Sequence, residues 1–177
     1  MFELLFPFFL IFLFFLALAI IWRNNARKYI SSGTVASAYD AWTQDKLLER
    51  LWGEHIHLGF YPSGKKNIDF RKAKVQFVHE LVKWSGLDKL PQGSRILDVG
   101  CGIGGSSRIL AEYYGFNVTG ITISPAQVKR ARELTPHGLN CNFQVMDALD
   151  LKFEDGSFDA VWSVEAGAHM NDKTRFA

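Results

Sequence analysis

The stretch Arg95-Ile-Leu-Asp-Val-Gly-Cys-Gly-Ile-Gly-Gly105 decides the fold of this 177-residue chain. A short apolar run leads through Asp98 into four glycines within six residues, and residues 106–114 have the character of a helix closed by Gly115. Such a strand, turn and helix bring the backbone close to a ligand and offer it the free N–H groups of a helix N-terminus. The stretch therefore predicts a nucleotide-type binding turn.

Three more strands are predicted after this turn, over residues 116–123, 143–146 and 159–164. A helix that runs to about Leu134 separates the first two of them. Ser124 and Gln127 form a capping box at its start, and Pro125 suits its first position. Strands that alternate with helices favour βαβ units, so we expect an α/β fold with a Rossmann-like parallel sheet.

The region before the glycine stretch contains two helical patterns, Val35–Leu51 and Asn67–Trp84. The second has Asp69 in its first turn and ends at Gly86. The loop between them, residues 52–62, is rich in polar and aromatic groups. Two further expectations concern this region: Trp42 and Trp84 belong to the core, and the basic residues of 65–74 form a solvated face or, alternatively, touch an anionic membrane surface.

The N-terminus is apolar, with no charge from Leu4 to Trp22. As a helix these residues span roughly 28 Å, close to the about 30 Å of bilayer hydrocarbon. A cleaved signal peptide is the alternative, since Ala17-Leu-Ala19 resembles a cleavage site, but the residues before the apolar run are acidic rather than basic. We predict a single-pass membrane anchor, with the basic residues that follow it on the cytoplasmic side. They are Arg23, Arg27 and Lys28.

Charge divides the chain in the same way. Residues 1–28 hold three basic and one acidic side chain, and the remaining residues hold 17 of each. A neutral domain argues against nucleic acid as a partner. Cys101 and Cys141 are too few for a disulfide framework and lack metal-ligand spacing, so no metal is expected. We predict three parts: an anchor with its basic flank (1–28), a helical or lid region (29–90) and a ligand-binding core (91–177).

Two nucleotide ligands compete for the glycine turn. The spacing Gly100-x-Gly102-x-x-Gly105 fits a dinucleotide fingerprint, which also needs an acidic residue at the end of the second strand. The sequence there, Ile121-Thr-Ile-Ser124, has none. Asp98 in front of the glycines could instead receive a positively charged or hydroxyl-rich ligand. A nicotinamide-dependent oxidoreductase is therefore the weaker alternative.

The run Leu97–Gly105 closely resembles motif I of the class I S-adenosylmethionine-dependent methyltransferases. Asp147 after the third strand and Phe158-Asp-Ala-Val161 before the fourth fit the same family. The resemblance implies a sheet in the order 3-2-1-4-5-7-6, of which this chain holds strands 1–4, and S-adenosylmethionine as cofactor. It implies nine cofactor-binding residues: Asp98, Gly100, Cys101, Gly102, Gly104, Thr122, Gln127, Asp147 and Ala148. We expect the chain to be part of a longer enzyme.

Four further segments resemble the tocopherol-pathway C-methyltransferases: Ala38–Asp40, Trp52–Tyr61, Gly120–Pro125 and Trp162–Met170. This resemblance implies transfer of a methyl group to a ring carbon of a lipophilic prenylquinol. The acceptor must lose a proton, and the candidate bases are His169, Glu165, His55 and His57. The first two follow the fourth strand, where ligands bind in open α/β sheets, and the other two would form a lid. The alternative is a non-catalytic, membrane-tethered protein that binds the donor or a partner.

Overall fold

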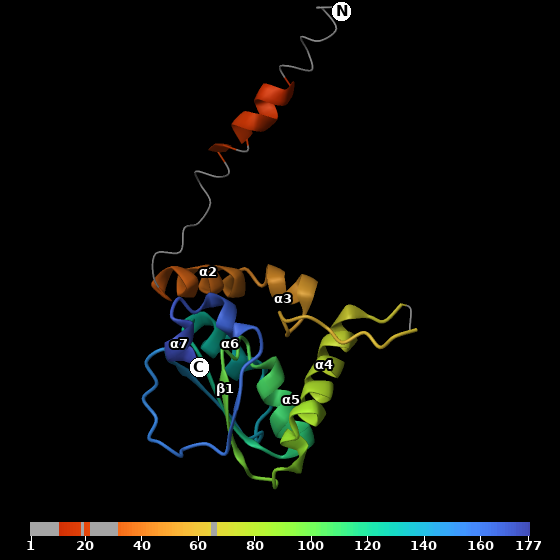
Figure 1. Cartoon of the computed structure of the whole chain (residues 1–177), viewed down its shortest axis with the longest axis vertical. Coiled ribbons are helices and arrows are strands. Elements are labelled where there is room, and N and C mark those ends of the chain that lie inside the picture. The colour runs from red at the N-terminus through yellow and green to blue at the C-terminus, as the bar shows by residue number, and fades with distance from the viewer. Residues whose placement is uncertain (1–10, 19, 22–31, 65–66) are drawn as a thin grey trace, which may run out of the picture. The chain divides into compact units, whose positions relative to one another are not determined.

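A computed structural model describes residues 11–18, 20–21, 32–64 and 67–177 (Figure 1). The chain divides into two compact units, Met1–Ile30 and Ser31–Ala177. In the first unit, residues 11–18 and 20–21 are helical and exposed. None of the helices in the described ranges is long and apolar enough to cross a membrane. The other residues of the predicted span Leu4–Trp22, and the basic flank that follows it, lie outside the described residues.

The second unit is built on a four-stranded parallel sheet. Its strands are β1 (Arg95–Val99), β2 (Asn117–Thr122), β3 (Cys141–Val145) and β4 (Ala160–Trp162), in the order β3-β2-β1-β4. In the register of the sheet, Asp98 lies between Gly120 of β2 and Trp162 of β4. The predicted Rossmann-like arrangement of strands 1–4 is therefore confirmed, with β4 shorter than the sequence suggested.

Helices α5 (Gly105–Tyr114) and α6 (Pro125–Leu134) connect the first three strands. Both begin and end where the sequence predicts. Gly115 ends α5 in the left-handed conformation, and the Ser124 hydroxyl accepts a hydrogen bond from the N–H of Gln127 at 3.1 Å. After β4 come two short helices, η2 (Ala166–His169) and α7 (Lys173–Phe176).

The core occupies both faces of the sheet because strand residues alternate between them. On one face, Ile96 packs with α5 and with Val78 and Val82 of α4 (Phe70–Ser85). On the other face, Leu97 and Val99 pack with Ile121 of β2. Asp98 shares the face of Ile96 and is buried with it, so the chain places a carboxyl group inside an apolar layer.

The region before α4 differs from the single helix predicted over Val35–Leu51. It forms α2 (Ser32–Gln44) and α3 (Leu47–Trp52), with the short η1 (Leu87–Lys89) following α4. The break lies at Asp45 and Lys46. The Asp45 side chain accepts the N–H of Leu47 at 2.8 Å, and Lys46 adopts a left-handed φ of 54°. This local hydrogen bond replaces the helical one, which is why the helix stops.

Three side-chain expectations for this region are wrong. Trp84 is 85% exposed because it lies on the side of α4 opposite to Val78 and Val82, and Trp42 is exposed too. The predicted solvated basic face includes Lys74, which is only 4% exposed. Lys74 shares the inner side of α4 with Ala73, so the helix period carries its ammonium group inward.

Candidate functional site

The glycine turn between β1 and α5 has three residues in the left-handed region: Gly100, Gly102 and Gly104, with φ of 78°, 56° and 81°. A Cβ at Gly104 would lie 2.7 Å from the Phe143 ring, so both conformation and space require glycine there. A Cβ at Gly102 would have no heavy atom within 4 Å beyond its chain neighbours. The turn is therefore packed on its inner side and open at Gly102.

Some N–H groups of this turn are already engaged. Those of Gly100 and Cys101 both donate to the carbonyl oxygen of Ile121, at 2.9 and 3.0 Å. The Cys101 side chain packs in a small apolar cluster. The N–H groups of Gly102 and Ile103 have no hydrogen-bond partner in the described part of the chain. These two backbone N–H groups of the glycine turn can therefore donate hydrogen bonds to a ligand.

Asp98 is the charged residue of the turn, and it is 2% exposed. Its carboxyl group accepts one hydrogen bond, from the Ser107 hydroxyl at 2.6 Å. Burial raises the pKa of Asp98 to about 7, although the Ser107 bond acts in the opposite direction. A cationic ligand group beside it would favour the ionised form. A buried carboxyl group and free N–H groups in one turn fit a ligand that carries both an amine and a carboxylate, as S-adenosylmethionine does.

Thr122 and Gln127, the predicted ribose contacts, are both buried and bind each other. The Thr122 hydroxyl donates to the side-chain oxygen of Gln127 at 2.7 Å and accepts the N–H of Ser124 at 3.3 Å. Asp40 of α2 stabilises the same corner, because its carboxylate accepts the Ser124 hydroxyl at 2.5 Å and the N–H of Ala126 at 3.1 Å. The first turn of α6 is thus bonded to α2.

Asp147 and Ala148, the other predicted donor contacts, lie directly after β3. The Asp147 carboxylate accepts the N–H of Leu149 at 2.9 Å, which forms a tight turn. Ala148 is partly buried against the apolar cluster of Leu97 and Ile121. Their contact with the cofactor, for Asp147 at the adenine amino group, stays a prediction.

His55 and His57 form a buried, hydrogen-bonded pair. The Nδ1–H of His57 donates to the carbonyl oxygen of Leu58 at 2.8 Å, which leaves its Nε2 to accept from Nδ1 of His55 at 3.1 Å. Burial is the main cause that lowers both pKa values, that of His55 to about 3, and the adjacent His57 lowers it further. Both rings are therefore neutral at pH 7, and His55 is a weak base.

The loop that follows α3 and carries both histidines, residues 53–62, is called the histidine loop below. It lies directly on the glycine turn. A Cβ at Gly105 would lie 2.8 Å from both the carbonyl oxygen of Glu54 and the ring of His55. Arg108 of α5 strengthens this contact, since it pairs with the Glu54 carboxylate at 2.5 Å and also donates to the Ile103 carbonyl oxygen at 2.8 Å. This position suits the predicted lid, a role that stays a prediction.

Two basic residues of α4 hold the start of the histidine loop. The Lys74 ammonium group donates to the carbonyl oxygens of Trp52 and His55 at 3.1 and 2.7 Å and lies 4.7 Å from the Trp52 ring. Arg71 donates to the carbonyl oxygens of Arg50 and Leu51 at 2.8 and 3.3 Å. These cations satisfy the free carbonyl groups at the end of α3.

His169 and Glu165, which follow β4, each bond to the N-terminal region. Nε2 of His169 lies 2.8 Å from the Tyr39 hydroxyl of α2. The Glu165 carboxylate accepts the N–H of Leu58, in the histidine loop, at 3.0 Å. Three of the four predicted bases, His55, His57 and Glu165, therefore meet at the loop after α3, whereas His169 contacts α2.

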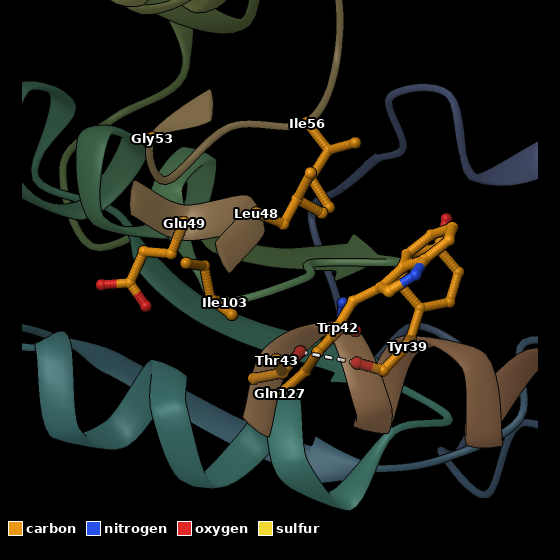
Figure 2. Close-up of a pocket in the computed structure, with 9 residues that line it drawn as sticks. All are labelled: Tyr39, Trp42, Thr43, Leu48, Glu49, Gly53, Ile56, Ile103 and Gln127. Carbon is orange, nitrogen blue, oxygen red and sulfur yellow. Dashed lines mark hydrogen bonds between the residues drawn. The ribbon is translucent and has the colours of Figure 1, made fainter. Parts of the chain in front are cut away.

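An open pocket lies between α2, α3 and the glycine turn (Figure 2). Nine residues line it: Tyr39, Trp42, Thr43, Leu48, Glu49, Gly53, Ile56, Ile103 and Gln127. Most are apolar or aromatic. The one carboxylate, Glu49, is paired with Arg130 at 2.6 Å, which is the main cause of its lowered pKa. Of the predicted site residues, only Gln127 lines the pocket directly.

Sequence reasoning missed Tyr39, Asp40 and Lys74 as site residues. The segment Ala38-Tyr-Asp40 was recognised as a motif, but nothing in the sequence connects it with Ser124 or His169, 84 and 130 positions away. In the sequence analysis, Lys74 belongs to a solvated face with its basic neighbours, although the 3.6-residue period of α4 puts it on the same side as Val78. That period was the signal that could have found it.

Comparison with known proteins adds the family. A family model described as a methyltransferase domain matches residues 96–177. Over 153 residues the chain is 63% identical to the 2-methyl-6-phytyl-1,4-hydroquinone methyltransferase of Synechocystis sp., covering 86% of this chain and 48% of that protein. Over 140 residues it is 43% identical to the chloroplastic tocopherol O-methyltransferase of Arabidopsis thaliana, covering 73% and 40%.

Among solved structures, the [4+2]-cyclase SpnF matches with a TM-score of 0.70 and 28% identity, covering 82% of this chain and 53% of that one. The chain spans about half the length of the curated relatives it matches. The matched methyltransferase domain fits two features of the structure, which are the order of the strands and the glycine turn next to the buried Asp98. Residues 96–177 thus match a methyltransferase domain, and the chain is similar to methyltransferases over most of its length.

Proposed function

We propose that this chain forms the donor-binding part of a methyltransferase that adds a methyl group to a ring carbon of a prenylated hydroquinone. The 63% identity with the Synechocystis enzyme carries this proposal, because it extends over 86% of the chain. The apolar and aromatic lining of the pocket beside the glycine turn suits such an acceptor.

S-adenosylmethionine supplies a methyl group already activated as a sulfonium. In this proposal Asp98 and the free N–H groups of Gly102 and Ile103 hold its amino-acid part. Thr122 and Gln127 lie at the ribose, and Asp147 with Ala148 at the adenine ring. The histidine loop covers the turn and excludes water, which strengthens the electrostatic contacts inside.

Methylation of a ring carbon replaces a hydrogen, so one proton must leave the acceptor for each methyl group gained. Tyr39 lines the pocket, and its hydroxyl lies 2.8 Å from His169. Burial raises the pKa of Tyr39, so the free phenol stays protonated. We assign it as a relay, which takes the acceptor's proton as it passes its own to Nε2 of His169. Glu165 positions the histidine loop through Leu58.

The location of the protein also belongs to this proposal. The uncharged segment Leu4–Trp22 acts as a single membrane anchor, and Arg23, Arg27 and Lys28 keep the catalytic domain on the cytoplasmic side. Its support is the length and composition of the segment. An anchor raises the effective concentration of the domain near a prenylated substrate that partitions into the bilayer.

Calorimetry and a methyl-transfer assay test the proposal together. The chain should bind S-adenosylhomocysteine and not a nicotinamide dinucleotide, since the latter needs an acidic residue where Thr122 stands. Labelled methyl transfer to 2-methyl-6-phytylhydroquinone, with NMR of the product, distinguishes carbon from oxygen methylation. The Synechocystis enzyme is the positive control. Donor binding without transfer, if it persists when the C-terminal half of the Synechocystis enzyme is joined to the chain, would favour the non-catalytic alternative, and dinucleotide binding would overturn both.

A further inference from the structure

Helix α3 has its apolar side turned outward. Leu47 and Leu51 are one helical turn apart and both exposed, the latter at 61%. The inner side carries Leu48, which lines the pocket, and Glu49, which pairs with Arg130. A helix that only stabilised the domain would bury its leucines and leave its charges in water. The outer side of α3 is thus suited to a contact outside this domain.

Other large apolar side chains near α3 are exposed as well, and two of them line the pocket. We define the docking face as six of the large exposed side chains of α2, α3 and the histidine loop: Trp42, Leu47, Leu51, Trp52, Ile56 and Leu58. Trp42 and Ile56 also line the pocket, so the face borders it (Figure 2). Leu58, in the loop, is 74% exposed. Contiguous apolar patches of this kind mark interaction sites.

The acidic and basic groups near the docking face differ in whether they are bonded within the domain. Four carboxylates near the face are bonded within the domain: Asp45 to the N–H of Leu47, Glu49 to Arg130, Glu54 to Arg108, and Asp69 to the first N–H groups of α4. Exposed cations remain next to the face. Lys46, Arg50 and Lys72 make no ion pair with any described residue. The face therefore presents leucine, tryptophan and positive charge together.

We propose that the docking face rests on an anionic lipid surface, with the opening of the pocket directed at the bilayer. Leucine and tryptophan enter the boundary between headgroups and acyl chains, while Lys46 and Arg50 meet anionic headgroups. A second copy of the chain fits this surface less well, because the carboxylates beside it are already bonded within the domain, Glu49 and Glu54 in ion pairs and Asp45 and Asp69 to backbone N–H groups.

The contact deepens the proposed function and rests on it for one point, the lipophilic nature of the acceptor. A prenylated ring could pass from the bilayer into the pocket without crossing water. The contact is distinct from the proposed anchor: nine residues lie between Trp22 and the start of α2 at Ser32, so an inserted segment would tether the docking face near lipid and let a weak contact form.

An environment-sensitive fluorophore on single cysteines tests the contact in the full chain. The probe replaces Leu51 (Leu51→Cys), and the matched control is Trp84→Cys, also highly exposed but at the far end of α4. The unsubstituted chain measures labelling of Cys101 and Cys141. Vesicles contain phosphatidylcholine alone or with phosphatidylglycerol. We expect a blue shift and increased emission for the Leu51 probe with phosphatidylglycerol, and an unchanged spectrum for the Trp84 probe.

Charge is tested by Lys46→Gln with Arg50→Gln in the Leu51→Cys background. Each basic residue contributes about a fivefold factor to binding of anionic vesicles, so the double variant should lose most of the preference for phosphatidylglycerol. An aqueous spectrum of the Leu51 probe in anionic vesicles would overturn the proposal. So would a blue shift without lipid that grows with protein concentration, which would indicate a second copy. These readouts need no methyl transfer, so they fail independently of the proposed function.

Discussion

The hydroxyl of Tyr39 and Nε2 of His169 lie 2.8 Å apart, although 130 positions separate the two residues in the chain. Tyr39 belongs to α2, before the sheet begins, and His169 to η2, after β4. Their rings also meet edge to face at 5.5 Å. This pair closes one side of the site and gives the pocket a group that can exchange a proton with His169.

The variant Tyr39→Phe removes this group and leaves the ring in place. We expect methyl transfer to fall by roughly a hundredfold, the typical contribution of a positioned acid or base, with binding of S-adenosylhomocysteine unchanged. Steady-state kinetics and calorimetry measure the two effects. The control is Tyr61→Phe, since Tyr61 is exposed and its hydroxyl has no hydrogen-bond partner among the described residues. Equal rates in the two variants would exclude the relay.

Asp98 should make stability depend on pH. Its pKa is about 7 in the folded protein and about 3.8 as a model value, so the unfolded chain releases the proton first. This raised pKa stabilises the fold at low pH, and the stabilisation is lost as the pH rises through about 4 to 7, at about 1.4 kcal/mol per pH unit. Above pH 7 both states are ionised and the contribution is gone.

His55 acts in the opposite direction over part of this range. Its pKa falls from 6.5 to about 3 on folding, which costs stability as the pH drops below 6.5 and partly hides the effect of Asp98. The variant Asp98→Asn isolates the carboxyl group. Its advantage over the parent chain in free energy of unfolding should grow between pH 5 and 7, as urea titrations at each pH would measure. A constant difference would show that Asp98 ionises normally.

The hydrogen bond between the two buried histidines can be tested by keeping or removing its donor. Asparagine reproduces the Nδ1–H position of histidine, so His55→Asn should keep the bond to His57. His55→Leu removes it and should cost about 1–3 kcal/mol, because Nε2 of His57 is left buried without a partner. Thermal unfolding at pH 7 compares the two. Equal destabilisation would show that the hydrogen bond between His55 and His57 contributes little to stability.

Lys74 should matter more than its neighbours in the basic run. In Lys74→Met the carbonyl oxygens of Trp52 and His55 lose their donor, so we expect about 1–3 kcal/mol of destabilisation and faster amide exchange in the histidine loop. Lys72→Met is the control, as Lys72 is exposed on the same helix. Calorimetry and hydrogen exchange provide the measurements. Equal destabilisation and equal amide exchange in the two variants would show that Lys74 contributes no more than an exposed lysine.

Alanine variants at two glycines with nearly equal φ distinguish the cost of backbone strain from the cost of steric crowding. Gly104 and Gly138 have φ of 81° and 85°, and a Cβ meets the Phe143 ring at 2.7 Å in the first case and nothing within 4 Å in the second. Both alanine variants carry the strain of a left-handed residue, about 1–2 kcal/mol. Gly104→Ala should cost about 1–3 kcal/mol more, and should also weaken donor binding. Calorimetry with S-adenosylhomocysteine measures that second loss.

Local sequence rules predicted much of the fold correctly. Helix α6 starts at the Ser124–Gln127 capping box, α5 ends at Gly115, and the order of the four strands follows from the resemblance to one family. These features depend on hydrogen bonds and conformations within a few residues, or on a shared motif. The division of α2 from α3 was missed because the Asp45 bond to Leu47 competes with an otherwise helical pattern.

Short stretches of the amino-acid sequence therefore predict the glycine turn, the parallel sheet and the similarity to methyltransferases, because each of these depends on neighbouring residues. Only the tertiary structure decided what surrounds the turn. It buried Lys74, paired His55 with His57, joined Tyr39 to His169 and turned the leucines of α3 outward. The physical reason is that burial and long-range hydrogen bonds depend on which segments meet after folding, and no spacing within one segment records that.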